Sequence, residues 1–272
     1  MRGSGEGARR RSDTRLPRRV VRAAAALGVP ADAITGLGGA TGQSWACDDR
    51  ILRIGGATDL AGEVGAMTAA ASAVPVPQVL DRAEFTDDEG RGWASLLLTR
   101  LPGRPALEAT DLSLREARRI GQVCGRLHML LEQVEPPRDM RRVAGASPGD
   151  DRTAAQDRLL HLDLHPLNVL VDSNGAVSGV IDWANAAAGP PVLDRARTWS
   201  IMVLDPATLP LRKDPRFAAL LEGWAGVAGW AQLSAAARTW ACEYMLDDLA
   251  ARHPADRLDR VREELARIRA IS

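Results

Sequence analysis

The chain of 272 residues contains one lysine, Lys213, although arginine is abundant. A P-loop nucleotide-binding enzyme needs a lysine within the pattern G-x-x-x-x-G-K-[ST], which is absent here, so that class is excluded. Net charge is also lacking, because 35 basic and 35 acidic side chains cancel. This balance favours neither a nucleic-acid nor a membrane partner. No apolar run approaches the roughly 18 residues of a membrane span.

Cysteine is also scarce, and the three residues Cys47, Cys124 and Cys242 lie far apart. An odd number at this spacing indicates neither a disulfide framework nor a zinc site, and we expect buried thiols in a reducing compartment. The arginine-rich N-terminus is not followed by an apolar segment, so it lacks the pattern of a secretory signal. These features predict a cytoplasmic protein.

The chain is long enough for one large domain or two modest lobes. Residues 1–19 are rich in Gly, Arg and Ser without periodicity, which predicts a disordered basic tail. A nucleic-acid-binding arm is the alternative interpretation of this tail. The Ala-rich stretch Val20–Leu27 then predicts a short helix that ends at Gly28 and Pro30.

The most informative stretch lies further on, where two short apolar runs, Val169–Val171 and Val177–Ile181, flank an Asn-Gly pair. Asn-Gly between β-branched residues predicts a tight β-hairpin. Folding that hairpin about Gly175 brings Asn168 and Asp182 opposite each other, within one residue of register. An amide oxygen and a carboxylate then converge at its open end.

These oxygens suit a hard cation such as Mg²⁺ that carries phosphates, so Asn168 and Asp182 are candidate metal ligands. Asp163 lies five residues before Asn168, in a loop that Pro166 stiffens. A third carboxylate near such a metal could orient and deprotonate a hydroxyl group, which makes Asp163 a candidate general base.

The segments H-L-D-L-H-P-L-N (161–168) and V-I-D-W (180–183) resemble the catalytic and metal-binding core of the aminoglycoside phosphotransferase family. The resemblance implies that Asp163 is the catalytic base and that Asn168 and Asp182 hold Mg²⁺. Small-molecule kinases usually read H-G-D-x-x-P-G-N, and here Leu162 and Leu167 replace both glycines.

The same resemblance implies a protein-kinase-like fold of the α+β class. Residues 20–101 would form a small N-terminal nucleotide-binding lobe, with an antiparallel sheet and one helix. Residues 102–272 would form a larger, mainly helical lobe for catalysis and substrate binding. In this lobe, G-P-P-V-L-D (189–194) resembles the family's G-D-P-x-x-D. Asp194 would then brace the catalytic loop through backbone hydrogen bonds, and it would also suit a helix N-cap.

In the N-terminal lobe, the alternation of apolar runs and turns between 33 and 56 predicts three strands, the second at Gln43–Cys47 and the third at Ile51–Ile54. Gly38 and Gly39 lie where the kinase-like fold places its nucleotide-covering loop, and glycine lets backbone N–H groups approach phosphates. Most glycine-rich turns, however, are only turns.

The third strand also carries Arg53, which by resemblance replaces the lysine that binds the α- and β-phosphates. A helix from Thr58 to Ala71, with Asp59 as its N-cap, would present Glu63 to this arginine. A first-turn glutamate favoured by the helix dipole is the alternative explanation of Glu63.

Two further strands are predicted at Gln78–Phe85 and Trp93–Leu101. The second runs into Pro102-Gly103, which resembles the connector between the lobes. The base of ATP or GTP would bond to its backbone between Leu98 and Leu101.

In the C-terminal lobe, Ser113 and Glu116 form a capping box that predicts a helix to about Val134. His128 on this helix is expected to be a packed or surface residue. Residues 135–157 predict a loop, and helices are expected near 215–228, 234–252 and 255–271, with Trp224, Trp230 and Trp240 in the core. Glu243 and Asp247 lie one turn apart and could bind the ammonium groups of a cationic substrate; a solvated face is the alternative.

The function that these patterns favour is the transfer of a phosphoryl group from ATP or GTP, with Mg²⁺, to a hydroxyl group of a small molecule. An aminoglycoside-like or other antibiotic is the expected acceptor, by analogy with the family. We expect a monomer or homodimer that binds no nucleic acid and no membrane. Two alternatives stay open: a catalytically inactive kinase-like binding protein, and a metallohydrolase that uses His161, Asp163 and His165.

Overall fold

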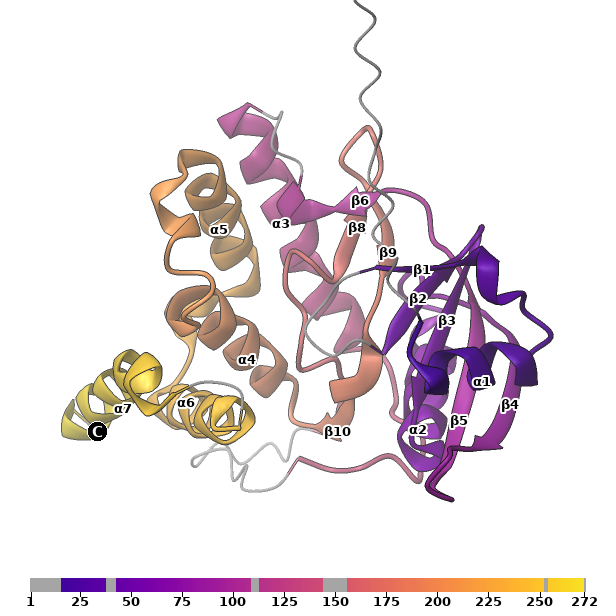
Figure 1. Cartoon of the computed structure of the whole chain (residues 1–272). Coiled ribbons are helices and arrows are strands. Elements are labelled where there is room, and N and C mark those ends of the chain that lie inside the picture. Colours follow the sequence, from indigo (N-terminus) through magenta and orange to yellow (C-terminus); the bar gives the residue numbers. More distant parts are fainter. Residues whose placement is uncertain (1–15, 38–42, 109–112, 144–155, 252–253, 272) are drawn as a thin grey trace, which may run out of the picture.

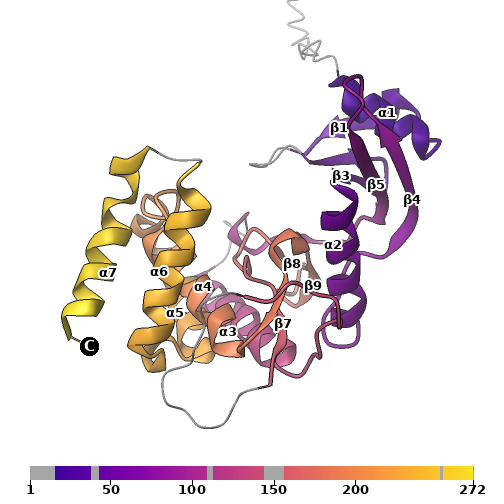
Figure 2. The same ribbon diagram turned by 90° about the horizontal axis from the view of Figure 1, so that it is seen from below.

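The computed structural model describes residues 16–37, 43–108, 113–143, 156–251 and 254–271. An antiparallel sheet with two helices forms an N-terminal lobe, and helices with short strands form a larger C-terminal lobe (Figures 1 and 2). The predicted α+β class with a small sheet lobe and a mainly helical lobe is therefore confirmed.

The N-terminal lobe has five strands in the order β1-β2-β3-β5-β4, with every neighbouring pair antiparallel in the described residues. Its elements are α1 (Arg18–Ala26), the 3-10 turn η1 (Ala31–Ala33), β1 (Ile34–Gly36), β2 (Ser44–Cys47), β3 (Arg50–Gly55), α2 (Ala57–Ala70), β4 (Val79–Thr86) and β5 (Gly92–Thr99).

The two faces of this sheet bury different cores. Leu52, Ile54 and Leu97 pack with α1 on the outer face (Figure 1), whereas Leu96 and Leu98 belong to the core shared with α2 and the C-terminal lobe. Successive side chains of a strand point to opposite faces. Arg53, between Leu52 and Ile54, is therefore directed inward, toward Glu63 of α2.

Two boundaries in this lobe differ from the sequence-based expectation. The first helix begins at Arg18, so Arg18 and Arg19 do not belong to a disordered tail; residues 1–15 lie outside the described part of the chain. Asp59 is not the N-cap of α2, because β3 runs through Gly55 directly into a helix whose N-cap is Gly56. Asp59 lies instead in the first turn.

The C-terminal lobe holds a two-stranded ladder β10-β7 and a three-stranded ladder β6-β8-β9 in the described residues. Its elements are β6 (Arg104–Pro105), η2 (Ala106–Glu108), α3 (Leu114–Leu131), β7 (Arg158–Leu160), β8 (Val169–Val171), β9 (Val177–Val180), η3 (Trp183–Asn185), β10 (Ala187–Gly189), α4 (Pro191–Leu204), η4 (Leu211–Lys213), α5 (Pro215–Ala228), η5 (Trp230–Gln232), α6 (Ala235–Leu249), η6 (Ala255–Leu258) and α7 (Asp259–Ile271).

The predicted hairpin is formed by β8 and β9, in which Val169 pairs with Val180. Its turn is longer than a two-residue Asn-Gly turn, since Gly175 alone takes a positive φ (70°) there and Asp172 N donates to Ala176 O at 2.9 Å. Continuing the register places Asn168 opposite Ile181, so Asp182 lies one residue beyond Asn168, as expected.

The helical core forms where α3 packs against α5 (Figure 1). A Cβ atom at Gly121 would clash with Leu220 O, and one at Gly223 would clash with Arg118 O, so glycine permits this close approach. The Ser113–Glu116 capping box is present at the start of α3, and the predicted burial of the three tryptophans and three cysteines is confirmed.

Among the helices that the structure describes, none combines the length and the apolar character required to cross a bilayer.

Candidate active site

Asn168 connects the three predicted catalytic positions. Its side-chain Nδ2 donates to the Asp163 backbone oxygen at 2.9 Å and to Asp163 Oδ2 at 3.2 Å. Its own backbone oxygen accepts from Ile181 N at 2.9 Å, the residue before Asp182. The hairpin therefore anchors the Asp163 loop at the end where Asp182 emerges, as the register argument predicts.

His161 is a structural residue of this loop. Its Nε2 donates to Ile181 O at 3.1 Å and its Nδ1 accepts from Asp163 N at 3.2 Å, while the ring packs 4.6 Å from the Trp183 ring. Burial lowers the pKa of His161 below its ordinary value despite nearby carboxylates, so the ring is neutral.

Both ring nitrogens of His161 are therefore engaged, and neither is available to a metal. Within the described ranges, no group of three His, Cys, Asp or Glu side chains could hold a metal ion. The metallohydrolase hypothesis, which required His161, Asp163 and His165 as ligands, has no site in this structure.

The Asp163 carboxylate is partly exposed (23%) and lies 3.6 Å from His165 Nε2. Burial raises the pKa of Asp163, but the neighbouring His165 ring and the Arg197 guanidinium outweigh it and leave the pKa below its ordinary value. The carboxylate is therefore ionised at neutral pH and can accept a hydrogen bond from a substrate hydroxyl.

Asp194 at the start of α4 holds the catalytic loop. Its Oδ1 accepts from His161 N at 2.9 Å and from Leu162 N at 2.7 Å, and its Oδ2 contacts His128 Nδ1 at 2.9 Å. Trp224 Nε1 donates to His128 Nε2 at 3.3 Å. The predicted brace is thus confirmed, His128 is a packed residue, and the N-cap alternative is wrong because Pro190 caps α4.

Arg53 and Glu63 form a buried, forked ion pair. Arg53 Nε and Nη2 lie 3.1 and 2.8 Å from the two Glu63 oxygens, and Nη2 also lies 3.4 Å from Asp182 Oδ1. Burial alone would lower the pKa of Arg53, but Glu63 and Asp182 raise it above its ordinary value. Glu63 is the seventh residue of α2, so the first-turn explanation is wrong. The guanidinium links the N-terminal lobe to Asp182.

The oxygen atoms left at the hairpin end fit a magnesium ion. Because Nδ2 of Asn168 is committed to Asp163, its Oδ1 remains as an acceptor, and the Asp182 side chain is 39% exposed. Amide and carboxylate oxygens are ligands that Mg²⁺ accepts, with further positions left to phosphate and water. Asn168 and Asp182 would hold the ion.

The family model described as "Phosphotransferase enzyme family" (APH) matches residues 37–156 and 146–236. The chain belongs to this family. Over 36 residues it is 47% identical to the uncharacterized protein YcbJ of Bacillus subtilis (strain 168), a match that spans 13% of this chain and 12% of that protein.

Solved structures of low sequence identity share the fold. A microcompartment-associated aminopropanol kinase is 16% identical, with a TM-score of 0.59 over 91% of this chain and 94% of its own. Aminoglycoside 2'-phosphotransferase-IIIa in its GDP complex is 14% identical (TM-score 0.56; 92% and 97%). Aminoglycoside-3'-phosphotransferase of type VIII is 17% identical (TM-score 0.55; 88% and 99%). The predicted protein-kinase-like fold is confirmed.

This phosphotransferase departs from the glycine pattern of small-molecule kinases in two different ways. Leu162 has a φ of 58°, a left-handed conformation that costs a non-glycine residue about 1–2 kcal/mol. Its fully buried side chain and the Asp194 and Arg197 bonds to its backbone hold it there. Leu167 has no positive φ and is 44% exposed, so its position does not require glycine.

Arg197 is a loop-bracing residue that sequence reasoning missed. Its Nε donates to Leu162 O at 3.3 Å, its Nη2 lies 2.6 Å from Asp248 Oδ2 on α6, and its guanidinium lies over the Tyr244 ring at 5.0 Å. Thr198 Oγ1 adds a bond to Leu164 O at 2.8 Å. The helical phase of α4, three and four residues after Asp194, is the one sequence signal for these contacts.

The two predicted substrate acids lie on α6 near Asp248 but make different contacts. Glu243 pairs with Arg269 of α7 at 2.6 Å, and Asp247 is exposed. No contact of either residue with Asp163 is present among the described residues. Their role in binding a cationic substrate stays a prediction.

The predicted nucleotide contacts are distributed over the N-terminal lobe and the connector. Gly38 and Gly39 lie outside the described residues. Leu98 lies inside β5, paired with strands on both sides, whereas Leu101 follows the strand and packs against Gly179 of β9. The connector itself is fixed by Ser178 Oγ, which donates to Pro102 O at 2.6 Å.

Proposed function

We propose that this chain transfers the γ-phosphoryl group of ATP or GTP to a hydroxyl group of a small molecule. The observation that carries the proposal is the Asn168 side chain, which holds the Asp163 loop against the hairpin end that bears Asp182. Arg53 reaches the same carboxylate from the other lobe. The proposed base, the two proposed oxygen ligands and the proposed phosphate-binding cation are linked by these contacts, which supports the proposal.

Each side chain has a defined task in this reaction. Asp163 orients the acceptor hydroxyl and takes its proton as the oxygen attacks the γ-phosphorus; the bond to the bridging oxygen breaks, and ADP or GDP leaves. Arg53, fixed by Glu63, binds the α- and β-phosphates. Mg²⁺ held by Asn168 and Asp182 would supply charge neutralisation on the phosphates.

The similar structures support a nucleotide and a small-molecule acceptor. Aminoglycoside 2'-phosphotransferase-IIIa was solved with GDP, and APH(2")-IIIa with GDP and kanamycin. We therefore propose an aminoglycoside or another antibiotic as the first acceptor to test, with GTP tested beside ATP. Glu243 and Asp247 are the acids proposed to contact its ammonium groups.

The test is a nucleoside-diphosphate release assay with ATP and GTP across antibiotics, sugars and amino alcohols, followed by variants on the best acceptor. Asp163→Asn should lower kcat by about 10²–10⁴-fold and leave nucleotide affinity unchanged, because it removes the proton acceptor and no phosphate contact. Asp32→Asn, at an exposed position in η1, is the matched control and should be fully active.

Equal turnover in Asp163→Asn and Asp32→Asn would refute the assignment of the base. Nucleotide binding without diphosphate release for any acceptor would instead support the catalytically inactive alternative.

A further inference from the structure

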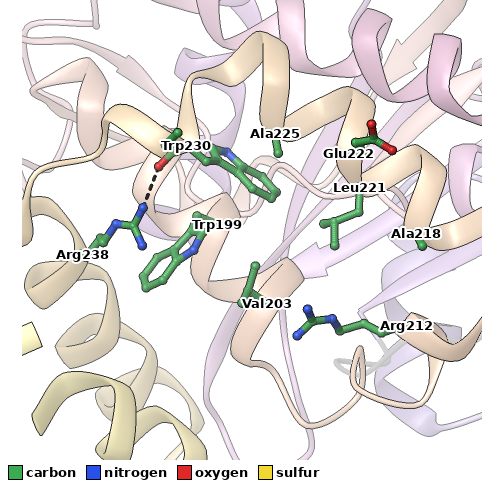
Figure 3. A pocket seen from close by; sticks show the side chains of 10 residues that line it. Trp199, Val203, Arg212, Ala218, Leu221, Glu222, Ala225, Trp230 and Arg238 are labelled. Carbon is green, nitrogen blue, oxygen red and sulfur yellow. Dashed lines mark hydrogen bonds between the residues drawn. The ribbon is translucent and has the colours of Figure 1, made fainter. Parts of the chain in front are cut away.

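A pocket of about 390 Å³ lies on the C-terminal lobe between α4, α5, η5 and α6 (Figure 3). Its volume is within the range of small-molecule sites, roughly 300–1,000 Å³. Its lining includes none of the candidate active-site residues Asp163, Asn168, Asp182 and Arg53. Among the described residues, no hydrogen bond joins a side chain of the lining to any of these four. The pocket is therefore separate from the candidate active site.

The centre of the pocket is aromatic and aliphatic. Figure 3 shows the indole rings of Trp199 and Trp230 near the middle, with Val203 and Leu221 beside them. Both tryptophans are 5% exposed and are held in the core, so their positions are fixed before any ligand arrives. The part of each indole that remains exposed lies beside Val203 and Leu221, so the pocket offers a ligand a small, rigid apolar surface.

The two ends of the pocket carry positive charge. Arg238 lies over the Trp199 ring at 4.9 Å, and its Nη2 donates a hydrogen bond to Trp230 O at 2.8 Å. These two contacts fix its guanidinium. At the opposite end Arg212 turns its guanidinium toward the pocket (Figure 3). Arg212 is exposed and forms no ion pair with the described residues.

Two acids at or near the pocket are already paired. In the described part of the chain, Glu222 is the one acid in the lining, and its carboxylate lies 2.5 Å from Arg118 of α3. Glu264 of α7 also acts on Arg238 electrostatically, but it pairs with Arg267 at 2.6 Å. The pocket consequently has an excess of positive charge over an apolar centre.

We propose that this pocket binds a small aromatic carboxylate. The aromatic ring packs against Trp199 and Trp230, and the carboxylate accepts charge-assisted hydrogen bonds from Arg212, where a guanidinium fork matches two carboxylate oxygens. Arg238 adds favourable charge at the other end. This proposal is independent of phosphoryl transfer.

The experiment titrates the full chain with 2-naphthoate while tryptophan emission is followed, because two of the seven tryptophans line the pocket. Neutral 2-naphthylmethanol and cationic 2-naphthylmethylamine have the same ring and serve as charge controls. We expect 2-naphthoate to bind about tenfold or more tighter than the neutral probe, which is the size of a charge-assisted hydrogen bond.

Matched variants locate the site. Arg212→Gln should remove most of the preference for the carboxylate, whereas Lys213→Gln, which deletes a charge one residue away and outside the lining, should keep it. Ala225→Phe should fill the pocket and abolish binding of all three probes, with the fold checked by circular dichroism.

Three results would overturn the proposal: no saturation with 2-naphthoate at its solubility limit, equal affinity for the anionic and neutral rings, or equal losses in Arg212→Gln and Lys213→Gln. Binding that persists in a folded Ala225→Phe protein would place the ligand elsewhere and would also overturn it.

Discussion

Two buried charge clusters flank the catalytic loop, and they are built differently. In the first, Arg53 and Glu63 pair side chain to side chain and reach a partly exposed Asp182. In the second, Asp194 lies between the His128 side chain and two backbone N–H groups of the loop. One cluster joins the lobes, and the other lies wholly within the C-terminal lobe.

The difference lies in what each cluster satisfies. The Arg53 guanidinium also contacts Ser44 Oγ at 3.3 Å and Asp182 Oδ1 at 3.4 Å, but neither residue is fully buried, so removing the Arg53–Glu63 pair leaves no buried group without a partner. Asp194 satisfies backbone groups that cannot be mutated away, because every substitution leaves His161 N and Leu162 N in place. The first cluster can therefore serve ligand binding, while the second maintains the loop conformation.

The largest expected effect comes from replacing each pair by apolar residues. The free energy of unfolding of Arg53→Met/Glu63→Leu should be nearly the same as that of the natural chain, because a buried ion pair often stabilises a protein no more than a packed apolar pair does. His128→Phe/Asp194→Leu should lose about 3–9 kcal/mol, since three buried N–H groups (His161 N, Leu162 N and Trp224 Nε1) lose their acceptors at about 1–3 kcal/mol each. Urea unfolding measures both.

The first double variant should nevertheless lose nucleotide affinity, which calorimetric titration of the same samples with MgATP or MgGTP would show. Equal losses of stability in the two double variants would contradict the distinction between the clusters.

A smaller effect tests the strain inside the second cluster. Leu162 and Leu164 are both fully buried and lie two residues apart, but only Leu162 has a positive φ. Leu162→Gly should therefore cost about 1–2 kcal/mol less than Leu164→Gly, because glycine relieves the left-handed strain at position 162. Chemical denaturation of the two variants gives this difference directly. A larger loss for Leu162→Gly would show that the strain is not stored there.

The smallest effect concerns pH. Burial lowers the pKa of His161 below the 6.5 of the free side chain, so the unfolded chain binds more protons than the folded chain below that pH. Its contribution to stability is complete above pH 6.5 and is lost as the pH falls through this value, by up to about 1.4 kcal/mol per pH unit.

Unfolding free energies at pH 8, 7, 6 and 5 should show this slope in the natural chain and in the control His165→Gln. His161→Asn should flatten it. An unchanged slope in His161→Asn would assign the pH dependence to other groups.

Local patterns predicted a large part of the candidate site. The hairpin register brought Asn168 and Asp182 within one residue of each other, and Ser113 capped the long helix as expected, whereas Arg53 and Glu63 were paired through the family resemblance. The hairpin and the cap depend on neighbours in the chain, and their geometry follows from steric rules that act over a few residues.

The misses have an equally physical origin. The Arg197–Asp248 pair joins two residues that lie 51 positions apart in the chain, and its formation depends on how α4 and α6 are packed. The positive φ of Leu162 could not be predicted from the sequence, because a leucine at that position gives no local signal for a left-handed conformation. Asp59 is not the N-cap of α2, although the sequence predicted it, because β3 runs through Gly55 and the helix begins two residues before Asp59.

The amino-acid sequence alone predicted the strands of the N-terminal lobe, the capped helix after Ser113, the hairpin and the residues that could perform phosphoryl transfer, because periodicity, turn chemistry and motif spacing are properties of short segments. It did not predict β6, β7 or β10. The tertiary structure alone decided which charges are paired, that the His161 ring is neutral, and that a pocket lined by two arginines forms among α4, α5 and α6. The burial of a side chain and its choice of partner depend on segments that are distant in the chain. Only the packed core brings these segments together.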